Sequence, residues 1–459
     1  MTRAETTPRK QQDHPLKKVL LIAGRYRAEN PYLELAVKRR LEAHGIQVIL
    51  GLPTRAINPA CFPDEIRNDP VFQNEGARFL ESVGDFVRAM RGCQLVLFSS
   101  WKGYAALEQW AAHLGRLTMD FNALVGLDHY GVGRDLCLIK SPVVHRLLLN
   151  NPTWWATRPP LPQHIRMTGS ILYEDPEGLA SRHGMADRQT FCRHYGFDPE
   201  RPIAVLFPKA IIGFRKKVRI WFKDWTETQI DEYNQWFLDH YLAIAQAAKE
   251  SGCNFMVKLH PSSYASYWCR AEEEYDYWNQ YPWIKILDTI HTHPMFHHMD
   301  VGLGINTHSA MDTAYFGKPF IYVEADRATL PSLPGFHAKE HGCTLHPGPS
   351  SHWHENPTEY PNPWFSSWLG YSARLHELPA LLRNPATYRI NPEHQQRIIA
   401  EFWHRNDGGA SAQIVQEVMN ECAVRLRSPD RWRSPAVWRG SFQDFTGRVL
   451  DRIRSWRQN

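Results

Sequence analysis

Polar residues follow two apolar runs in the second half of this sequence. His260 and Pro261 come directly after the run 255–259, and the polar turn 306–312 comes directly after the run 301–305. Because proline ends strand pairing, we expect His260 to lie at the carboxyl edge of a sheet. An imidazole there can donate a hydrogen bond to a phosphate oxygen or to a leaving group. We therefore predict a phosphate-binding site at these strand ends.

The turn 306–312 has the residue types that an anion site needs. A strand, a small polar turn and a helix start expose backbone N–H groups and the partial positive charge of the helix. Thr307 and Ser309 add hydroxyl donors, and His308 lies between them. Asp312 lies about one turn into the helix, where a carboxylate can accept hydrogen bonds from ribose hydroxyls. The alternative is a tight loop with a capping serine and a surface histidine.

Two further loops carry charge at expected strand ends. The loop after the run 203–207 is basic, and it either binds pyrophosphate or faces water as a solvated loop. The loop after the first apolar run, 18–24, can contact an acceptor or a phosphate. The charged residues are Arg215, Lys216 and Lys217 in the former loop, and Arg25, Arg27 and Glu29 in the latter.

The elements that position these residues alternate between strand and helix. The run 18–24 ends in glycine, the segment 31–44 has apolar residues at helical spacing, and 46–50 is the next apolar run. Such a βαβ unit, with its right-handed crossover, begins a doubly wound sheet. Further strands and a helix of this half are expected at 94–98, 104–114, 117–120, 123–128 and 135–139.

A second alternation of the same kind begins near residue 201. We predict an α/β protein with two Rossmann-like domains facing a central cleft, because open sheets bind ligands beyond the carboxyl ends of their strands. Strands of the second half are expected at 203–207, 255–259, 284–287, 301–305 and 319–323, with a long helix at 231–251. The expected division is a disordered tail at 1–15, an N-terminal acceptor domain at 16–165, a C-terminal nucleotide-donor domain at 166–424 and a basic amphipathic helix at 425–459.

Composition narrows the class of protein. Hydrophobic residues make up 43% and charged residues 22%, which is typical of a globular chain. A formal net charge of +5 is too weak to indicate nucleic acid, and it fits a basic cleft for a phosphorylated donor equally well. No CxxC pair occurs, and the spacing of His291, His293, His297 and His298 fits a helix better than a zinc site. We expect no metal site.

The sequence predicts a cytoplasmic protein. No apolar run approaches the length of a membrane span, and residues 1–14 lack the apolar core of a secretion signal. The arginine-rich segment 425–459 has apolar residues on one helical face. That face suits three alternatives, which are packing on the N-terminal domain, exposure to water, and peripheral contact with an anionic membrane at the inner face of the cell.

Five short motifs occur in an order that resembles a known family. They are Val-Lys-Leu-His-Pro ending at Pro261, Asn-Thr-His-Ser-Ala-Met-Asp ending at Asp312, Gly-Lys-Pro ending at Pro319, Pro-Gly-Pro ending at Pro349 and Asp-Gly-Gly-Ala-Ser ending at Ser411. This order resembles the C-terminal domain of the CDP-glycerol glycerophosphotransferases, which make teichoic-acid-type polymers. It is also similar to the capsule-polysaccharide sugar transferases, including those that transfer Kdo. The resemblance covers about half of the chain.

This resemblance implies a GT-B glycosyltransferase fold and metal-independent transfer, with a nucleotide-activated donor as substrate and no cofactor. It implies donor phosphates near His260, Thr307 and Ser309, and a ribose at Asp312. The turn around His129 resembles the His-Gly turn that carries a base in those enzymes, the alternative being a hydrogen-bonded turn histidine. Those phosphotransferases favour an Asp-Tyr-Ser-Ser-like turn where this chain has Thr-His-Ser-Ala, so the donor base stays open.

The predicted function is transfer of a sugar or an alditol phosphate from a CDP- or UDP-type donor to a cell-envelope polysaccharide or a lipid-linked acceptor. Donor and acceptor are the expected partners, and no nucleic acid is expected. Two alternatives stay open, which are a nucleotide-sugar epimerase of the same fold and a non-catalytic glycan-binding assembly subunit.

Overall fold

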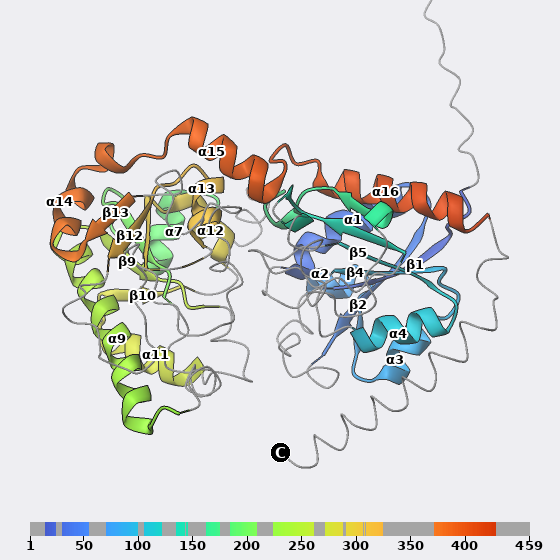
Figure 1. Ribbon diagram of the computed structural model, residues 1–459, viewed down its shortest axis with the longest axis horizontal. Coiled ribbons are helices and arrows are strands. Elements are labelled where there is room, and N and C mark those ends of the chain that lie inside the picture. Colours follow the sequence, from blue (N-terminus) through green and yellow to red (C-terminus); the bar gives the residue numbers. More distant parts are fainter. Residues whose placement is uncertain are drawn as a thin grey trace, which may run out of the picture.

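The chain forms two parallel sheets that lie side by side, and α-helices connect most of their consecutive strands (Figure 1). The computed structural model describes residues 14–23, 30–54, 70–99, 105–121, 135–142, 144–145, 162–174, 184–208, 224–260, 271–287, 291–305, 307, 309–324 and 371–427. None of the described helices combines the length and the apolar composition needed to span a bilayer.

The first sheet has seven parallel strands in the order β3-β2-β1-β4-β5-β6-β7. Strands β4, β5 and β6 are buried along their whole length, as expected for strands covered on both faces. The strands are β1 Lys18–Ile22, β2 Gln47–Pro53, β3 Arg78–Leu80, β4 Leu95–Ser99, β5 Leu117–Phe121, β6 Leu136–Ile139 and β7 Ile165–Met167, and the helices are α1 Asn30–Ala43, α2 Pro70–Asn74, α3 Val83–Ala89 and α4 Ala105–His113.

The second sheet has six parallel strands in the order β10-β9-β8-β11-β12-β13. The strand order reverses at β8, which pairs with β9 on one side and with β11 on the other. The strands are β8 Ile203–Leu206, β9 Asn254–Val257, β10 Ile284–Ile286, β11 Val301–Gly304, β12 Phe320–Glu324 and β13 Tyr371–Arg374, and the helices are α7 Arg188–Tyr195, α9 Glu227–Glu250, α11 Ala271–Asn279, α12 Thr292–His298, α13 Ser309–Tyr315, α14 Leu378–Arg383 and α15 Pro392–Ile398.

The long helix α9 has clear start and stop residues. The side chain of Thr226 accepts a hydrogen bond from the backbone N–H of Gln229 (3.3 Å), and the side chain of Gln229 accepts one from the backbone of Thr226 (2.8 Å). This reciprocal pair is a capping box, which satisfies two N–H groups that have no partner inside the helix. Gly252, with a φ of +80°, ends the helix by adopting the left-handed conformation that glycine tolerates.

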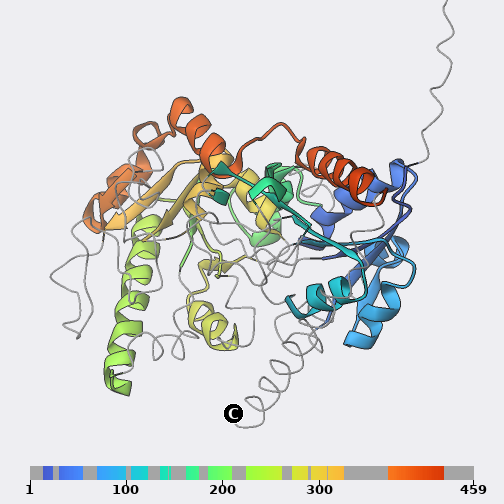
Figure 2. The same ribbon diagram turned by 45° about the vertical axis from the view of Figure 1, so that its right-hand side comes forward.

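Helix α16 (Ala410–Arg425) carries the chain back to the first sheet, where it packs on α1 and β6. Figure 2 shows α16 in red against the blue α1. At its end, Arg425 donates to the Asp135 carboxylate (3.0 Å) and lies 3.2 Å from Nε2 of His164. The His14 ring donates from Nε2 to the Met419 carbonyl (3.1 Å), so both ends of the described chain pack on the first half.

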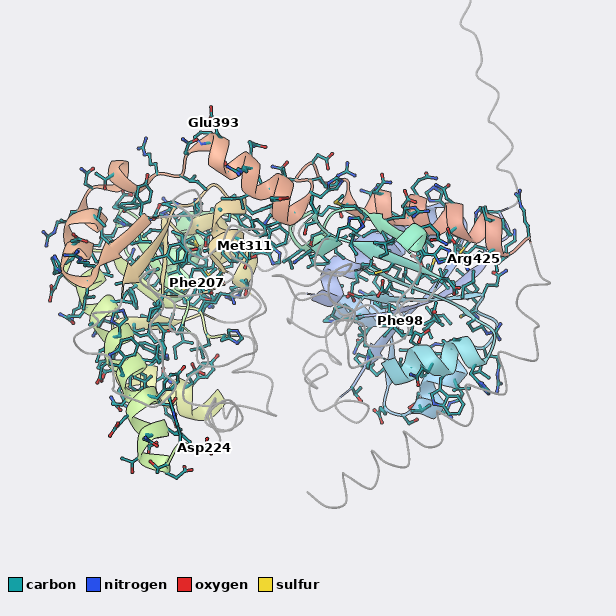
Figure 3. All side chains as sticks on the ribbon, in the orientation of Figure 1. Phe98, Phe207, Asp224, Met311, Glu393 and Arg425 are labelled. Carbon is teal, nitrogen blue, oxygen red and sulfur yellow. The ribbon has the colours of Figure 1, made fainter. Side chains whose placement is uncertain are left out.

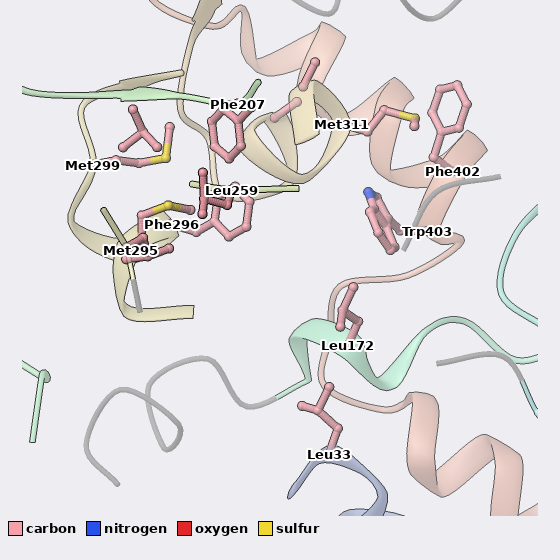
Figure 4. Close-up of a cluster of buried hydrophobic side chains, with 14 of the residues drawn as sticks. Leu33, Leu172, Phe207, Leu259, Met295, Phe296, Met299, Met311, Phe402 and Trp403 are labelled. Carbon is pink, nitrogen blue, oxygen red and sulfur yellow. The ribbon is translucent and has the colours of Figure 1, made fainter. Parts of the chain in front are cut away.

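One apolar cluster joins the two halves of the molecule. It includes Leu33 from α1, Leu172 from the short helix η5 (Ile171–Tyr173) and Trp403 from the π-helix η12 (Ile399–Trp403). Figure 4 shows Leu172 between Leu33 and Trp403. In Figure 3, by contrast, Phe98 and Phe207 lie deep within separate halves. The core is therefore continuous between the two sheets.

The structure confirms the expected alternation of strands and helices wherever the chain is described. The strand expected at 123–128 lies outside the described residues. The sequence does not predict β3, β7 or β13, because each of these short segments has no more than two apolar residues and so forms no apolar run.

Two observations bear on the expected domain boundaries. Strand β7 belongs to the first sheet, so that sheet extends past residue 165, and α16 packs on the first half although it falls within the range 166–424. The described residues begin at His14, inside the segment expected to be a disordered tail. The part of the expected basic helix beyond residue 427 lies outside the described residues.

Candidate functional site

The carboxyl ends of β8, β9 and β11 lie at one edge of the second sheet. Leu206 of β8 pairs with Val257 of β9 and with Leu303 of β11. One residue further along, the backbone N–H of Phe207 donates to the Leu303 carbonyl, and that of Lys258 donates to the Leu206 carbonyl, both at 2.9 Å. The strand order reverses at β8, and such switch points are where open α/β sheets bind ligands.

His260 follows β9 at this edge, and its side chain is partly exposed. Two residues earlier, Lys258 is only 7% exposed, which is unusual for a lysine. The end of β9 thus supplies a buried cation and an imidazole, two groups that phosphate sites use. Sequence reasoning did not single out Lys258, because a lysine at a strand end is expected to face water.

Thr307 and Ser309 form the turn between β11 and α13, and both are partly buried. The backbone N–H of Ser309 donates to Oγ1 of Thr307 (3.2 Å), and the hydroxyl of Thr313 donates to the Ser309 carbonyl (2.6 Å). Because the Thr307 oxygen accepts the backbone N–H, its own hydrogen is left for another acceptor. The turn is therefore held by its own hydrogen bonds and can offer a hydroxyl donor.

Asp312 lies inside the molecule rather than at the surface of α13. Its side chain is 0% exposed, and its neighbours Met311 and Thr313 are also buried. A direct contact between this carboxylate and a ribose hydroxyl therefore requires the residues that cover Asp312 to move. In its present place near the start of the helix, the carboxylate complements the partial positive charge of the helix N-terminus.

Aromatic rings fill the space beside β8 and β11. The ring of Phe207 stacks on Phe296 with centroids 5.8 Å apart, and Phe296 stacks on Phe316 at 5.3 Å. Phe320 of β12 lies 6.2 Å from Phe207. Figure 4 shows the pair Phe207 and Phe296 beside Leu259, the residue before His260. The residues next to the strand ends are therefore part of a close-packed core.

A charged contact joins the two halves near α13. Lys140, which follows β6 and is 1% exposed, places its Nζ 5.0 Å from the centroid of the Trp403 ring. The Trp403 ring in turn lies 5.7 Å from Tyr315, the last residue of α13. Burial raises the pKa of Tyr315 to about 12, so its hydroxyl stays protonated at neutral pH. The contact between the halves thus reaches the helix that begins at Ser309.

The motif that ends at Ser411 lies at the junction of the two halves. The carboxylate of Glu174 accepts from the backbone (2.9 Å) and the hydroxyl (2.6 Å) of Ser411, and Arg40 of α1 donates to the same hydroxyl (2.6 Å). Arg405 donates twice to Asp407, at 2.7 and 2.6 Å, and these hydrogen bonds lower the pKa of Asp407 to about 2. Glu174 thus caps the first turn of α16, and within the motif Asp407 accepts the backbone N–H of Gly409 (3.0 Å) just before the helix.

The histidines considered as metal ligands have other partners. Nδ1 of His291 lies 2.8 Å from the Tyr195 hydroxyl, and the rings of His293 and His298 donate to backbone carbonyls at 2.6 and 2.7 Å. They lie in or beside α12, the helix that the sequence predicts. Over the described ranges, no three His, Cys, Asp or Glu side chains are arranged to hold a metal ion.

The structure describes part of the predicted site. His260 follows β9, Thr307 and Ser309 follow β11, and β8 lies between these two strands. Asp312 lies in α13, which follows this turn. The remaining predicted residues stay predictions, because they lie outside the described residues. These are Arg25, Arg27, Glu29, His129, Arg215, Lys216, Lys217, Pro261 and His308.

This chain matches no protein-family model and no curated protein by sequence. Among solved structures it is similar to UDP-N-acetylglucosamine 2-epimerase from Rickettsia bellii, with 12% identity and a TM-score of 0.50 over 90% of this chain and 99% of that one. The chain has the GT-B fold. Its two parallel sheets, each with the strand order of a Rossmann-like domain, confirm the predicted α/β architecture.

Two further solved structures show weaker likeness to this GT-B chain. UDP-GlcNAc 2-epimerase from Neisseria meningitidis, bound to UDP-GlcNAc, has 10% identity and a TM-score of 0.49 over 88% of this chain and all (100%) of that one. The wall teichoic acid polymerase TagF has 10% identity and a TM-score of 0.47 over 90% of each chain. At these identities the likeness concerns the fold alone.

Proposed function

We propose that this chain transfers a sugar or an alditol phosphate from a CDP- or UDP-type donor to a cell-envelope polysaccharide or a lipid-linked acceptor. The observation that supports the proposal is the adjacency of β8, β9 and β11. It brings His260, Thr307 and Ser309 to one sheet edge, at the point where the strand order reverses. Hydroxyl, imidazole and backbone donors suit the phosphates of a nucleotide.

In this proposal the transfer leaves negative charge on the phosphate of the departing nucleotide. His260, Thr307 and Ser309 donate to that phosphate, and the nearby Lys258 adds positive charge. Donors that are already fixed before the reaction need no reorganisation as charge develops, which is why such sites accelerate transfer. The reaction then needs neither a metal ion nor a cofactor.

The acceptor half of the proposal rests on the first domain. The acceptor hydroxyl loses its proton to His129, its oxygen forms the new bond to the transferred group, and the bond from that group to the donor phosphate breaks. The loop with Arg25, Arg27 and Glu29 contacts the acceptor. A lipid-linked acceptor would bring the protein to the inner face of the membrane, where the basic segment 425–459 contacts anionic lipid.

A nucleotide panel tests the donor site. CDP or UDP is expected to raise the Tm of the full-length protein, and His260→Ala to weaken nucleotide binding about tenfold, the loss of one hydrogen bond to a charged phosphate. His376→Ala is the matched control, because His376 is exposed and follows the edge strand β13. The proposal is wrong if no nucleotide changes the Tm and His260→Ala behaves like the control.

A nucleotide-sugar epimerase is the second candidate, because the solved structure with a TM-score of 0.50 is a UDP-N-acetylglucosamine 2-epimerase. An epimerase converts UDP-GlcNAc without any acceptor, whereas a transferase releases nucleotide only when an acceptor is added. Chromatography of the nucleotide sugars after incubation with and without acceptor separates the two. Glycan binding without nucleotide affinity would instead indicate a non-catalytic assembly subunit.

A further inference from the structure

Gly304, the last residue of β11, lies against the turn that carries Thr307. A Cβ added at Gly304 would lie 3.3 Å from the methyl carbon of Thr307, 3.3 Å from the carbonyl oxygen of Phe207 and 3.1 Å from the ring of Phe320. The φ of Gly304 is not positive, so any residue could adopt its backbone conformation. Space, rather than conformation, is what requires glycine here.

The side chain of Thr307 is fixed at both of its branches. Its methyl group points at Gly304, and its Oγ1 accepts the backbone N–H of Ser309 (3.2 Å). A β-branched side chain held on both branches has one χ1 rotamer, and the direction in which its hydroxyl can donate is limited accordingly. The close approach to Gly304 therefore sets where the Thr307 hydroxyl lies.

The backbone of Phe207, on the other side of Gly304, cannot easily move. The Phe207 carbonyl belongs to the backbone, and the N–H of Phe207 is bonded to the Leu303 carbonyl (2.9 Å). The ring of Phe207 is also stacked on Phe296 at 5.8 Å. A methyl group added at position 304 would therefore displace the side chains of Thr307 and Phe320 rather than the strand β8.

We propose that Gly304 is a positioning residue for the donor site, because the absence of its Cβ lets the Thr307 hydroxyl face the nucleotide phosphate. This inference rests on the proposed function. It assigns a role to a residue that touches no nucleotide and acts only through Thr307. The position of the hydroxyl depends on contact between Gly304 and the Thr307 methyl group, so the two positions are energetically coupled.

A double-mutant cycle on nucleotide binding tests this coupling. Gly304→Ala is expected to raise the Kd for CDP or UDP about tenfold, within the range that overpacking produces. Thr307→Ser keeps the hydroxyl but removes the methyl group, and should raise the Kd about threefold because serine is not held in one rotamer. In the Thr307→Ser background, Gly304→Ala should then change the Kd less than about threefold.

Gly302→Ala is the matched control. A Cβ at Gly302 would lie 2.7 Å from the Phe320 ring and 3.2 Å from the Phe207 ring, and its three nearest atoms all belong to these two rings rather than to Thr307. We expect a lower Tm for this variant, but an unchanged nucleotide Kd when it is measured below its melting range. A general packing defect would weaken binding in both glycine variants alike, and that result would overturn the inference.

The outcomes separate this inference from the function on which it rests. If the unaltered protein binds no nucleotide, the proposed function is wrong, and the positioning role with it. If the unaltered protein binds nucleotide and Gly304→Ala has the same Kd, only the positioning role is wrong. The same holds if Gly304→Ala raises the Kd by the same factor with Thr307 and in the Thr307→Ser background. Should Gly304→Ala fail to fold, Thr307→Ser alone decides, because an unchanged Kd would show that the methyl contact is not needed.

Discussion

At the scale of single residues, burial decides what several side chains can do. Burial lowers the pKa of both the His298 imidazole and the Lys318 ammonium, because a charged group loses its hydration there. His298 is 6% exposed and donates from Nε2 to the Met185 carbonyl (2.7 Å). The positive charges of Arg188 and Lys318 also oppose its protonation. His298 is thus a structural group that is stable in its neutral form.

Stability is expected to fall as the pH falls below about 6.5, in part because of His298. Its pKa is lower in the folded than in the unfolded chain, so the unfolded chain binds the proton more readily. The stability that His298 contributes is therefore fully present above its pKa in the unfolded chain. It is lost as the pH falls toward its pKa in the folded protein. Melting curves of the unaltered protein and of His298→Gln, which keeps an N–H donor but does not titrate, measure it.

The Tm of His298→Gln should fall less than that of the unaltered protein between about pH 7.5 and about pH 5.5. His376→Gln is the control, because His376 is exposed and should show the pH dependence of the unaltered protein. If all three proteins lose stability in parallel, His298 does not contribute as we predict.

At the scale of elements, short helices depend on their neighbours. Helix α13 has seven residues, too few to be stable by itself. Its last residue, Tyr315, accepts a hydrogen bond from Gln395 of α15 (3.2 Å) and contacts Trp403 of the π-helix η12. That π-helix is followed by His404, a non-glycine residue with a φ of +66°. Such strain persists only where surrounding contacts hold it, and here the contacts lie at the junction of the two halves.

Glu174→Ala is expected to lower the stability of the protein by about 1–2 kcal/mol, because its carboxylate caps α16 from another segment of the chain. The carboxylate accepts the backbone N–H of Ser411 (2.9 Å) and its hydroxyl (2.6 Å). Urea unfolding measures the effect. Glu417→Ala is the control on the same helix, since its ion pair with Arg166 spans 4.0 Å and is worth less than about 0.5 kcal/mol. Equal midpoints for the two variants would contradict the prediction.

At the scale of the whole molecule, an apolar cluster and specific polar contacts join the two sheets. The apolar cluster runs from Leu33 of α1 through Leu172 to Trp403 (Figure 4). Lys140 lies over the Trp403 ring. Helix α16 packs on α1, so the chain contacts the first half again after it leaves the second half. Among the described residues, Lys140 and Trp403 therefore link the first half to the end of α13.

Lys140→Met is expected to loosen the arrangement of the two halves. The substitution keeps the apolar stem but removes the cation over Trp403, an interaction worth about 2 kcal/mol when it is desolvated. Small-angle X-ray scattering should then show a larger radius of gyration than for the unaltered protein. Binding of nucleotide should also weaken, because Trp403 contacts the end of α13.

The chain offers a matched control for this prediction. Lys249 places its Nζ 4.7 Å from the centroid of Trp283, a cation–π pair of similar geometry that lies within the second half. Lys249→Met should therefore leave the radius of gyration unchanged. Identical scattering curves for Lys140→Met and Lys249→Met would show that the Lys140 contact does not hold the halves together.

The α/β alternation could be predicted from the sequence by itself, because apolar periodicity follows from local backbone geometry. The same is true of His260, Thr307 and Ser309, since a polar residue directly after an apolar run marks a strand end. Strand β3 could not be predicted, because Arg-Phe-Leu has only two apolar residues and so shows no apolar run.

Only the tertiary structure decided which partners these residues have. Glu174 and Ser411 are 237 positions apart in the sequence, and no local pattern links them. The burial of Asp312 and Lys258 likewise depends on what packs against them. The positions of the apolar strand ends therefore follow from the sequence alone. The contacts around those ends come from segments that meet only in the fold, and these contacts decide what chemistry the residues at the strand ends can perform.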